Sequence, residues 1–197
     1  MEINSLLQNN SFFIKEHIGM FKISNNYDIY DTNSKKIILN SREQETDLLT
    51  KLFRFDKSTK IFAPFNLKIT STNGSSLLSV KKDWSFLYAR VCVYNEKDKL
   101  IGYFKQQNIL GGFSGIQFNA YDIKDKFLFK FKGQYNFKLV KDQEDLGSIV
   151  KKWKTAKEIF TSADDYVLEI NDAVPKNDFS RYFLLAAVFC IDMVIHE

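Results

Sequence analysis

The sequence predicts a mainly β protein, a closed antiparallel barrel of about twelve strands that encloses a hydrophobic C-terminal helix. Two observations lead to this fold. Residues 182–191 form an apolar run that no charge interrupts. Most of the chain before this run consists of short apolar or alternating segments, roughly 8–15 residues apart and separated by turn residues. Two prolines and eight glycines leave no flexible linker, so we expect residues 1–197 to form a single domain.

The C-terminal segment, residues 178–197, predicts a core helix. At helical spacing its apolar side chains cover every side, as in a helix that is surrounded by protein or inserted in a membrane. Crossing a bilayer takes about 20 apolar residues, whereas Arg181 and Asp192 bracket only ten here. Asp192 is then the one charge well inside the helix, and it must find a partner or stay protonated. The expected core positions are Phe183, Leu184, Ala187, Val188, Cys190, Ile191 and Asp192.

The strands are expected in a regular order, with hairpin turns between many of them. Asn73-Gly74 is the strongest turn signal, because Asn-Gly favours the tight turn of a hairpin. Residues 43–52 are the only further stretch that could form a helix of more than two turns. The expected strands are residues 11–18, 27–31, 36–40, 65–70, 76–81, 86–94, 99–105, 113–121, 127–132, 135–140, 146–153 and 166–171.

Composition narrows the class of protein. The net charge of +4 and the pI of about 8.9 are a mild bias towards anionic partners and do not indicate a nucleic-acid binder. Cys92 and Cys190 stand in apolar settings, so we expect buried thiols in a reducing compartment. No signal peptide or lipidation motif is visible, which predicts a cytoplasmic protein, peripheral at a membrane if it meets one.

The C-terminal third resembles the phospholipid scramblase family. The resemblance is carried by a Gly-x-Ile-x-Lys-x-Trp strand within residues 146–153, a Phe-Thr-x-Ala-Asp turn within 158–166, and the helix at 187–193 that leads to Glu197. Residues 91–102 also fit the middle region of that family. The resemblance implies a fold similar to the Tubby C-terminal domain and the plant LURP-one-related proteins, a twelve-stranded barrel around one hydrophobic helix. Members are linked to anionic phospholipid binding, to lipid scrambling, or to no known activity.

One family feature is only partly present. Scramblases carry an acidic segment proposed to bind calcium, with acidic residues at its first, third and twelfth positions. In this chain those positions are Ser162, Asp164 and Ala173, so only Asp164 matches. Calcium binding is possible but disfavoured, Asp164 and Asp165 are weak metal candidates, and no other cofactor is expected.

Six lysines are the candidate binding residues. Lys124, Lys126, Lys130 and Lys132 have even spacing, which would place all four on one strand face, opposite a row of phenylalanines. Lys151 and Lys152 add a basic run close in sequence. Such a patch favours anionic phospholipid head groups, although an outward barrel face covered by solvated lysine would give the same pattern.

Nothing in the sequence indicates an enzyme. His17 and His196 are the only histidines, and neither lies in a nucleophile motif. The glycines at 111, 112 and 115 indicate a turn, because a strand rather than a helix is expected after them. We therefore expect a non-enzymatic domain that binds anionic phospholipid or another membrane-surface ligand through a basic face. The alternatives are a protein–protein scaffold and a true phospholipid scramblase, the latter opposed by a filled barrel lumen.

Overall fold

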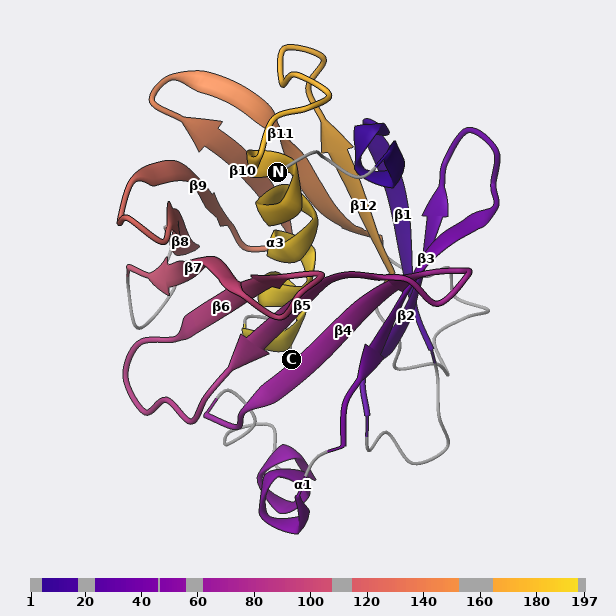
Figure 1. Cartoon of the computed structure of the whole chain (residues 1–197). Helices are drawn as coiled ribbons and strands as arrows, with labels where there is room; N and C mark the ends of the chain where they lie inside the picture. The colour runs from indigo at the N-terminus through magenta and orange to yellow at the C-terminus, as the bar shows by residue number, and fades with distance from the viewer. Residues whose placement is uncertain are drawn as a thin grey trace.

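Alternating apolar residues build a closed antiparallel β-barrel (Figure 1). The computed structural model describes residues 5–17, 24–45, 47–55, 62–107, 115–152 and 165–194. Within these residues each strand pairs with its neighbour in the chain, and β1 closes the ring by pairing with β12. The strands are β1 Ser11–Glu16, β2 Asn26–Asp31, β3 Ile37–Glu43, β4 Phe65–Ser71, β5 Ser76–Lys82, β6 Arg90–Asn95, β7 Leu100–Gln106, β8 Ile116–Asp122, β9 Phe127–Gly133, β10 Asn136–Lys141, β11 Glu144–Lys152 and β12 Asp165–Ile170.

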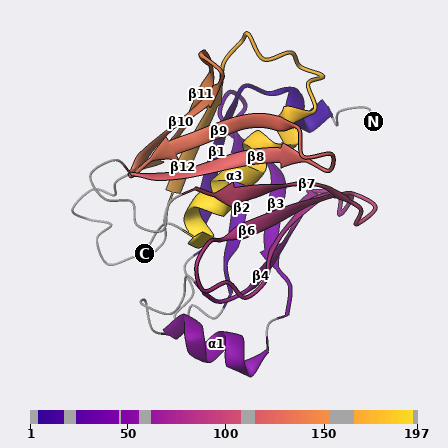
Figure 2. The ribbon, with the colours of Figure 1, turned by 90° about the vertical axis from the view of Figure 1, so that its left-hand side faces the viewer.

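The C-terminal helix α3, Ser180–Val194, lies inside the barrel, and the strands surround it in both views (Figures 1 and 2). Every residue from Arg181 to Val194 is buried, which confirms the predicted core helix. Fully burying one large apolar side chain contributes roughly 1.5–3 kcal/mol, so this helix supplies much of the core. The seven expected core positions, Phe183, Leu184, Ala187, Val188, Cys190, Ile191 and Asp192, are all buried.

Phenylalanines on the inner wall pack against one side of α3. The rings of Phe104 and Phe183 meet edge to face at 5.9 Å between centroids, and Phe118 stacks on Phe131 at 5.3 Å. These inward positions alternate with outward polar residues along each strand, as a closed barrel requires. The aromatic cluster on β7 to β10 consists of Phe104, Phe118, Phe129, Phe131 and Phe137, and all five side chains are buried.

The two ends of the barrel differ. At one end, named here the turn end, tight turns join β2 to β3, β4 to β5, β6 to β7, β8 to β9 and β10 to β11. The other end, the loop end, carries the short β9–β10 turn and the longer connections, including α1, Leu48–Phe55, between β3 and β4. The predicted Asn73-Gly74 turn is present at the turn end, where Gly74 adopts a φ of 86°.

Arg181, at the first turn of α3, ties several segments together at the turn end. Its guanidinium is fully buried and donates hydrogen bonds to four backbone carbonyls and to the side-chain oxygen of Asn10. The carbonyls belong to two segments far apart in the sequence, residues 7–9, which include part of the 3-10 helix η1, Ser5–Gln8, and residues 174–175. Burial lowers the pKa of Arg181, although Asp178 and Asp172 act in the opposite direction. The planar guanidinium suits this role because it offers five donors in fixed directions.

Two sequence expectations need correction. The short helix was expected at residues 43–52 but runs from Leu48 to Phe55, because Glu43 completes β3 and the Asp47 carboxylate accepts the N–H of Thr50 at 2.6 Å as a helix cap. The expected strand at 86–94 begins only at Arg90, and residues 86–88 before it are exposed. Both differences lie at the loop end, where apolar residues fall outside the barrel.

Candidate functional site

The predicted lysine set divides into two groups in the structure. Lys130 and Lys132 lie on β9, exposed on the outer face and alternating with buried Phe129 and Phe131, as expected. Lys124 and Lys126 instead lie in the turn between β8 and β9. The backbone N–H groups of both donate to the Asp122 carboxylate, at 2.8 and 3.0 Å. The prediction of four lysines on one strand face is therefore wrong for two of them, because the carboxylate organises a turn where a regular strand was assumed.

Lys151 and Lys152 occupy the last two positions of β11, at the loop end, and do not share one face. Lys151 is half-buried, and its register partner is Tyr166, whose side chain points into the barrel. Lys152 is exposed, opposite Asp165 on β12, which is in turn opposite Lys15 on β1. Around Lys152 the charges therefore alternate in sign across neighbouring strands, and this segment forms no cationic surface.

The structure adds three cations that the sequence analysis missed. Lys138 on β10 is the direct register partner of Lys132. Arg90 on β6 is the partner of Lys105 on β7, and Lys105 reaches Lys130 through one intervening residue, Asn119 on β8. Arg90 and Lys105 are 15 positions apart along the chain, and Lys105 and Lys130 are 25 apart, so the register of the barrel brings these cations together. We call the resulting surface the basic face: Arg90, Lys105, Lys130, Lys132 and Lys138.

The charge of the basic face is not balanced within its own strands. Across β6, β7, β8, β9 and β10 the single acidic residue is Asp122, and it occupies the last position of β8, at the turn end. Arg90 is held over the ring of Tyr103 at 3.8 Å from the centroid, and the Tyr103 hydroxyl donates to Asp125 at 2.6 Å. Neighbouring strands lie about 4.8 Å apart, so the two cations of each direct register pair, Arg90 with Lys105 and Lys132 with Lys138, fall within one Debye length, about 8 Å at physiological salt, and act together on a charged partner.

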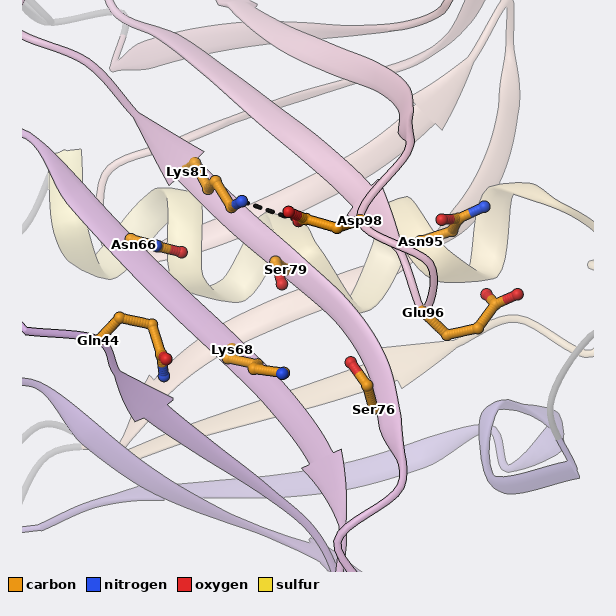
Figure 3. Close-up of a pocket in the computed structure, with 9 residues that line it drawn as sticks. All are labelled: Gln44, Asn66, Lys68, Ser76, Ser79, Lys81, Asn95, Glu96 and Asp98. Atoms are coloured by element: carbon orange, nitrogen blue, oxygen red, sulfur yellow. Dashed lines mark hydrogen bonds and ion pairs between the residues drawn. The ribbon is translucent and has the colours of Figure 1, made fainter.

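A second candidate is a polar hollow of about 220 Å³ on the outer wall of β4 and β5, bordered by the β6–β7 turn (Figure 3). Lys68 and Lys81 supply its cations, and Glu96 and Asp98 its carboxylates. The Lys81 ammonium already pairs with Asp98 at 2.8 Å and lies 4.5 Å from the centroid of the Tyr94 ring. Because two positive and two negative side chains line it, this hollow has no net preference for an anion. The remaining lining residues are Gln44, Asn66, Ser76, Ser79 and Asn95.

Of the two metal candidates, the structure describes only Asp165. Asp164, like Ser162, lies outside the described residues, while Asp165 faces outward on β12 between Lys15 and Lys152. Among the residues that the structure describes, no group of three or more His, Cys, Asp or Glu side chains could hold a metal ion.

Both cysteines and His17 lie within the described residues. Cys190 is buried on α3, and burial raises the pKa of its thiol well above the usual range. Cys92 was expected to be buried, but it faces outward on β6 and is half-buried; burial still raises its pKa. His17 pairs with Asp28 at 2.7 Å beside Arg42. His196 lies outside the described residues.

The family model described as Scramblase matches residues 1–197 of the chain. No curated protein matches it. Among the described residues, no helix has both the length and the apolar character that a membrane crossing requires.

Proposed function

The chain belongs to the scramblase family, and from this premise we propose that its barrel binds anionic phospholipid at a membrane surface through the basic face. Family membership supports a scramblase-related, lipid-associated role. The choice of surface rests on one observation, the direct register pairing of Lys132 with Lys138 within a set of cations on β6, β7, β9 and β10.

The pairing of Lys132 with Lys138 favours a ligand over simple solvation. Like charges directly opposite one another in a sheet are destabilising, by roughly 0.2–1 kcal/mol on the scale of cross-strand pairs. An anionic surface relieves this repulsion, and each lysine near such a surface contributes about 1 kcal/mol. Five cations on one face, at about 1 kcal/mol each, therefore supply several kcal/mol of binding free energy, which is enough for reversible peripheral attachment.

A lipid path through the barrel has no support in the structure. Helix α3 fills the lumen, and its fourteen residues from Arg181 to Val194 are all buried. Binding to the outer wall requires no such path, so it is the activity that the geometry supports best.

The test is co-sedimentation with vesicles of phosphatidylcholine alone or with phosphatidylserine. We expect binding to the anionic vesicles that weakens steeply between roughly 50 and 500 mM salt, because screening shortens the Debye length. The variant Lys130→Glu/Lys132→Glu should lose most of this binding. Lys124→Glu/Lys126→Glu is the matched control, because it changes the net charge equally at the turn end, outside the basic face.

The outcomes separate clearly. Loss of binding in the β9 variant and retention in the turn variant support the basic face. Equal loss in both variants would show that only net charge matters, and unchanged binding in both would remove this surface from the mechanism.

A further inference from the structure

Large apolar side chains gather at the loop end, outside the barrel. Of the ten that are exposed in the described residues, six belong to two short segments, α1 and the connection from β5 to β6. Leu48, Leu52, Phe86 and Leu87 are 64–79% exposed. We call these six the apolar patch: Leu48, Leu49, Leu52, Phe86, Leu87 and Tyr88.

Ring contacts hold the two segments of the patch together. Phe53 of α1 packs edge to face on Trp84 at 5.0 Å between centroids. Phe62, in the chain that returns from α1 to β4, stacks on Phe86 at 5.9 Å, and its carbonyl accepts the N–H of Ser85 at 3.2 Å. The apolar patch is therefore a supported surface of two adjoining segments.

The leucines of α1 are exposed and lie on a different side of the helix from the residues that contact the protein. Thr50 is 1% exposed and Phe53 contacts Trp84, so this edge of the helix faces the protein. Leu48 and Leu52 are one helical turn apart and share a different side. Both views show α1 beyond the ring of strands, projecting from the loop end (Figures 1 and 2).

Charge identifies the partner that suits this surface. The basic face begins at Arg90, two residues after Tyr88, and continues from there through Lys105. Lys51 adds a cation on α1 itself. Protruding apolar groups that adjoin a cationic face match a bilayer interface, where acyl chains surround the apolar groups and phosphates pair with the cations.

We propose that the apolar patch inserts into the interfacial region of a phospholipid bilayer and orients the barrel with its loop end towards the membrane. This inference rests on the proposed function, since it adds an apolar anchor beside the basic face. Asp47 and Asp83 also border the patch, so the positive charge beside it comes mainly from the adjoining basic face. Burial of apolar side chains does not rely on charge, so the contribution of the patch should persist at high salt, where the contribution of the basic face is screened.

Trp84 is a native reporter of insertion, because it contacts Phe53 beneath the patch. The chain has two tryptophans, so Trp153→Phe leaves Trp84 as the single fluorophore. With vesicles of phosphatidylcholine and phosphatidylserine that carry a spin label in the upper acyl chain, we expect a blue shift and quenching of Trp84. Bound protein whose Trp84 is neither shifted nor quenched would overturn the proposal.

A set of surface variants tests the patch directly. Leu48→Ser/Leu52→Ser/Phe86→Ser/Leu87→Ser should lower the vesicle partition coefficient at 500 mM salt by at least about tenfold, given the apolar area removed. The control is Leu100→Ser/Ile123→Ser, which alters side chains that are 39% and 60% exposed at the turn end. All these side chains are exposed, so folding should be retained, and circular dichroism checks this. Equal partition of the patch and control variants would contradict the proposal.

Failure of this inference and failure of the proposed function give different results. If Lys130→Glu/Lys132→Glu binds as the parent does while Trp84 is still quenched, the basic face is wrong and the apolar patch stands. If that variant loses binding but Trp84 of the parent protein is never quenched, the basic face stands and insertion of the apolar patch is wrong. A vesicle-independent dimer that the patch variant abolishes would identify a second copy as the partner and overturn insertion.

Discussion

The hydroxyl of Tyr166 on β12 donates a hydrogen bond to the carboxylate of Asp192 on α3 across 2.7 Å, inside the barrel. The other carboxylate oxygen accepts the hydroxyl of Tyr27 on β2. Burial, together with the nearby Asp192 charge, raises the pKa of Tyr27 well above the usual range. The carboxylate within the apolar helix thus accepts hydrogen bonds from β12 and β2, the two strands that flank β1. These bonds hold α3 against this part of the barrel wall.

Removing this carboxylate should be strongly destabilising. We expect Asp192→Ala to lower the free energy of unfolding by about 3–5 kcal/mol, because two buried hydroxyls lose their acceptor. Tyr166→Phe removes one donor only and should cost about 1–2 kcal/mol. Urea unfolding followed by circular dichroism measures both changes. Glu169→Ala, an exposed site on the same strand, is the control and should stay within about 0.5 kcal/mol. An Asp192→Ala protein as stable as this control would show that the carboxylate does not hold α3.

Gly102 on β7 marks a place where the wall and the helix approach closely. A Cβ atom here would lie 2.2 Å from the Tyr121 carbonyl oxygen and 2.7 Å from the ring of Phe183. Gly102→Ala should therefore destabilise the barrel by about 2–4 kcal/mol through overpacking and strain. Gly74→Ala is a matched control with positive φ but nothing within 4 Å of the added atom, and should cost only about 1 kcal/mol. Thermal unfolding measures the stability of the two variants. Equal losses of stability would contradict the close approach of Gly102 to Tyr121 and Phe183.

Asp28 on β2 gives the protein a dependence on acid pH. Burial acts to raise its pKa, but hydrogen bonds from Arg42 and His17 outweigh this effect and lower the pKa below its ordinary value. The ion pair with Arg42 measures 2.7 Å. Because the folded pKa is depressed, this contribution to stability is present above about pH 4 and is lost as the pH falls through the folded value.

The corresponding variant is Asp28→Asn. It should be less stable than the parent by about 1 kcal/mol at neutral pH, and the gap should close at acid pH, where the parent carboxylate is protonated. Urea midpoints between pH 7 and pH 3 measure the gap. A gap of constant size over this range would assign the loss to packing rather than to charge.

Local chemistry explains which of the four lysines lie on the expected strand face. Lys130 and Lys132 alternate with buried phenylalanines within a single strand, and a period of two is a property of the strand alone. Lys124 and Lys126 share the same parity, but the Asp122 side chain closes a turn around them. Spacing could not distinguish these cases, since even spacing has structural meaning only where the backbone is extended. The Asp-Ile-Lys-Asp-Lys stretch before Phe127 is the signal that could have identified the turn.

The sequence by itself determined the barrel and its central helix, because hydrophobic period and the length of the apolar run are local properties that burial must satisfy. Only the tertiary structure decided which cations meet. Lys138, Lys105 and Arg90 join Lys130 and Lys132 through the register of neighbouring strands, which depends on the whole ring of hydrogen bonds. The tertiary structure also decided that residues 86–88 lie outside the barrel wall. The sequence of an apolar, strand-like segment does not indicate the residue at which β6 begins.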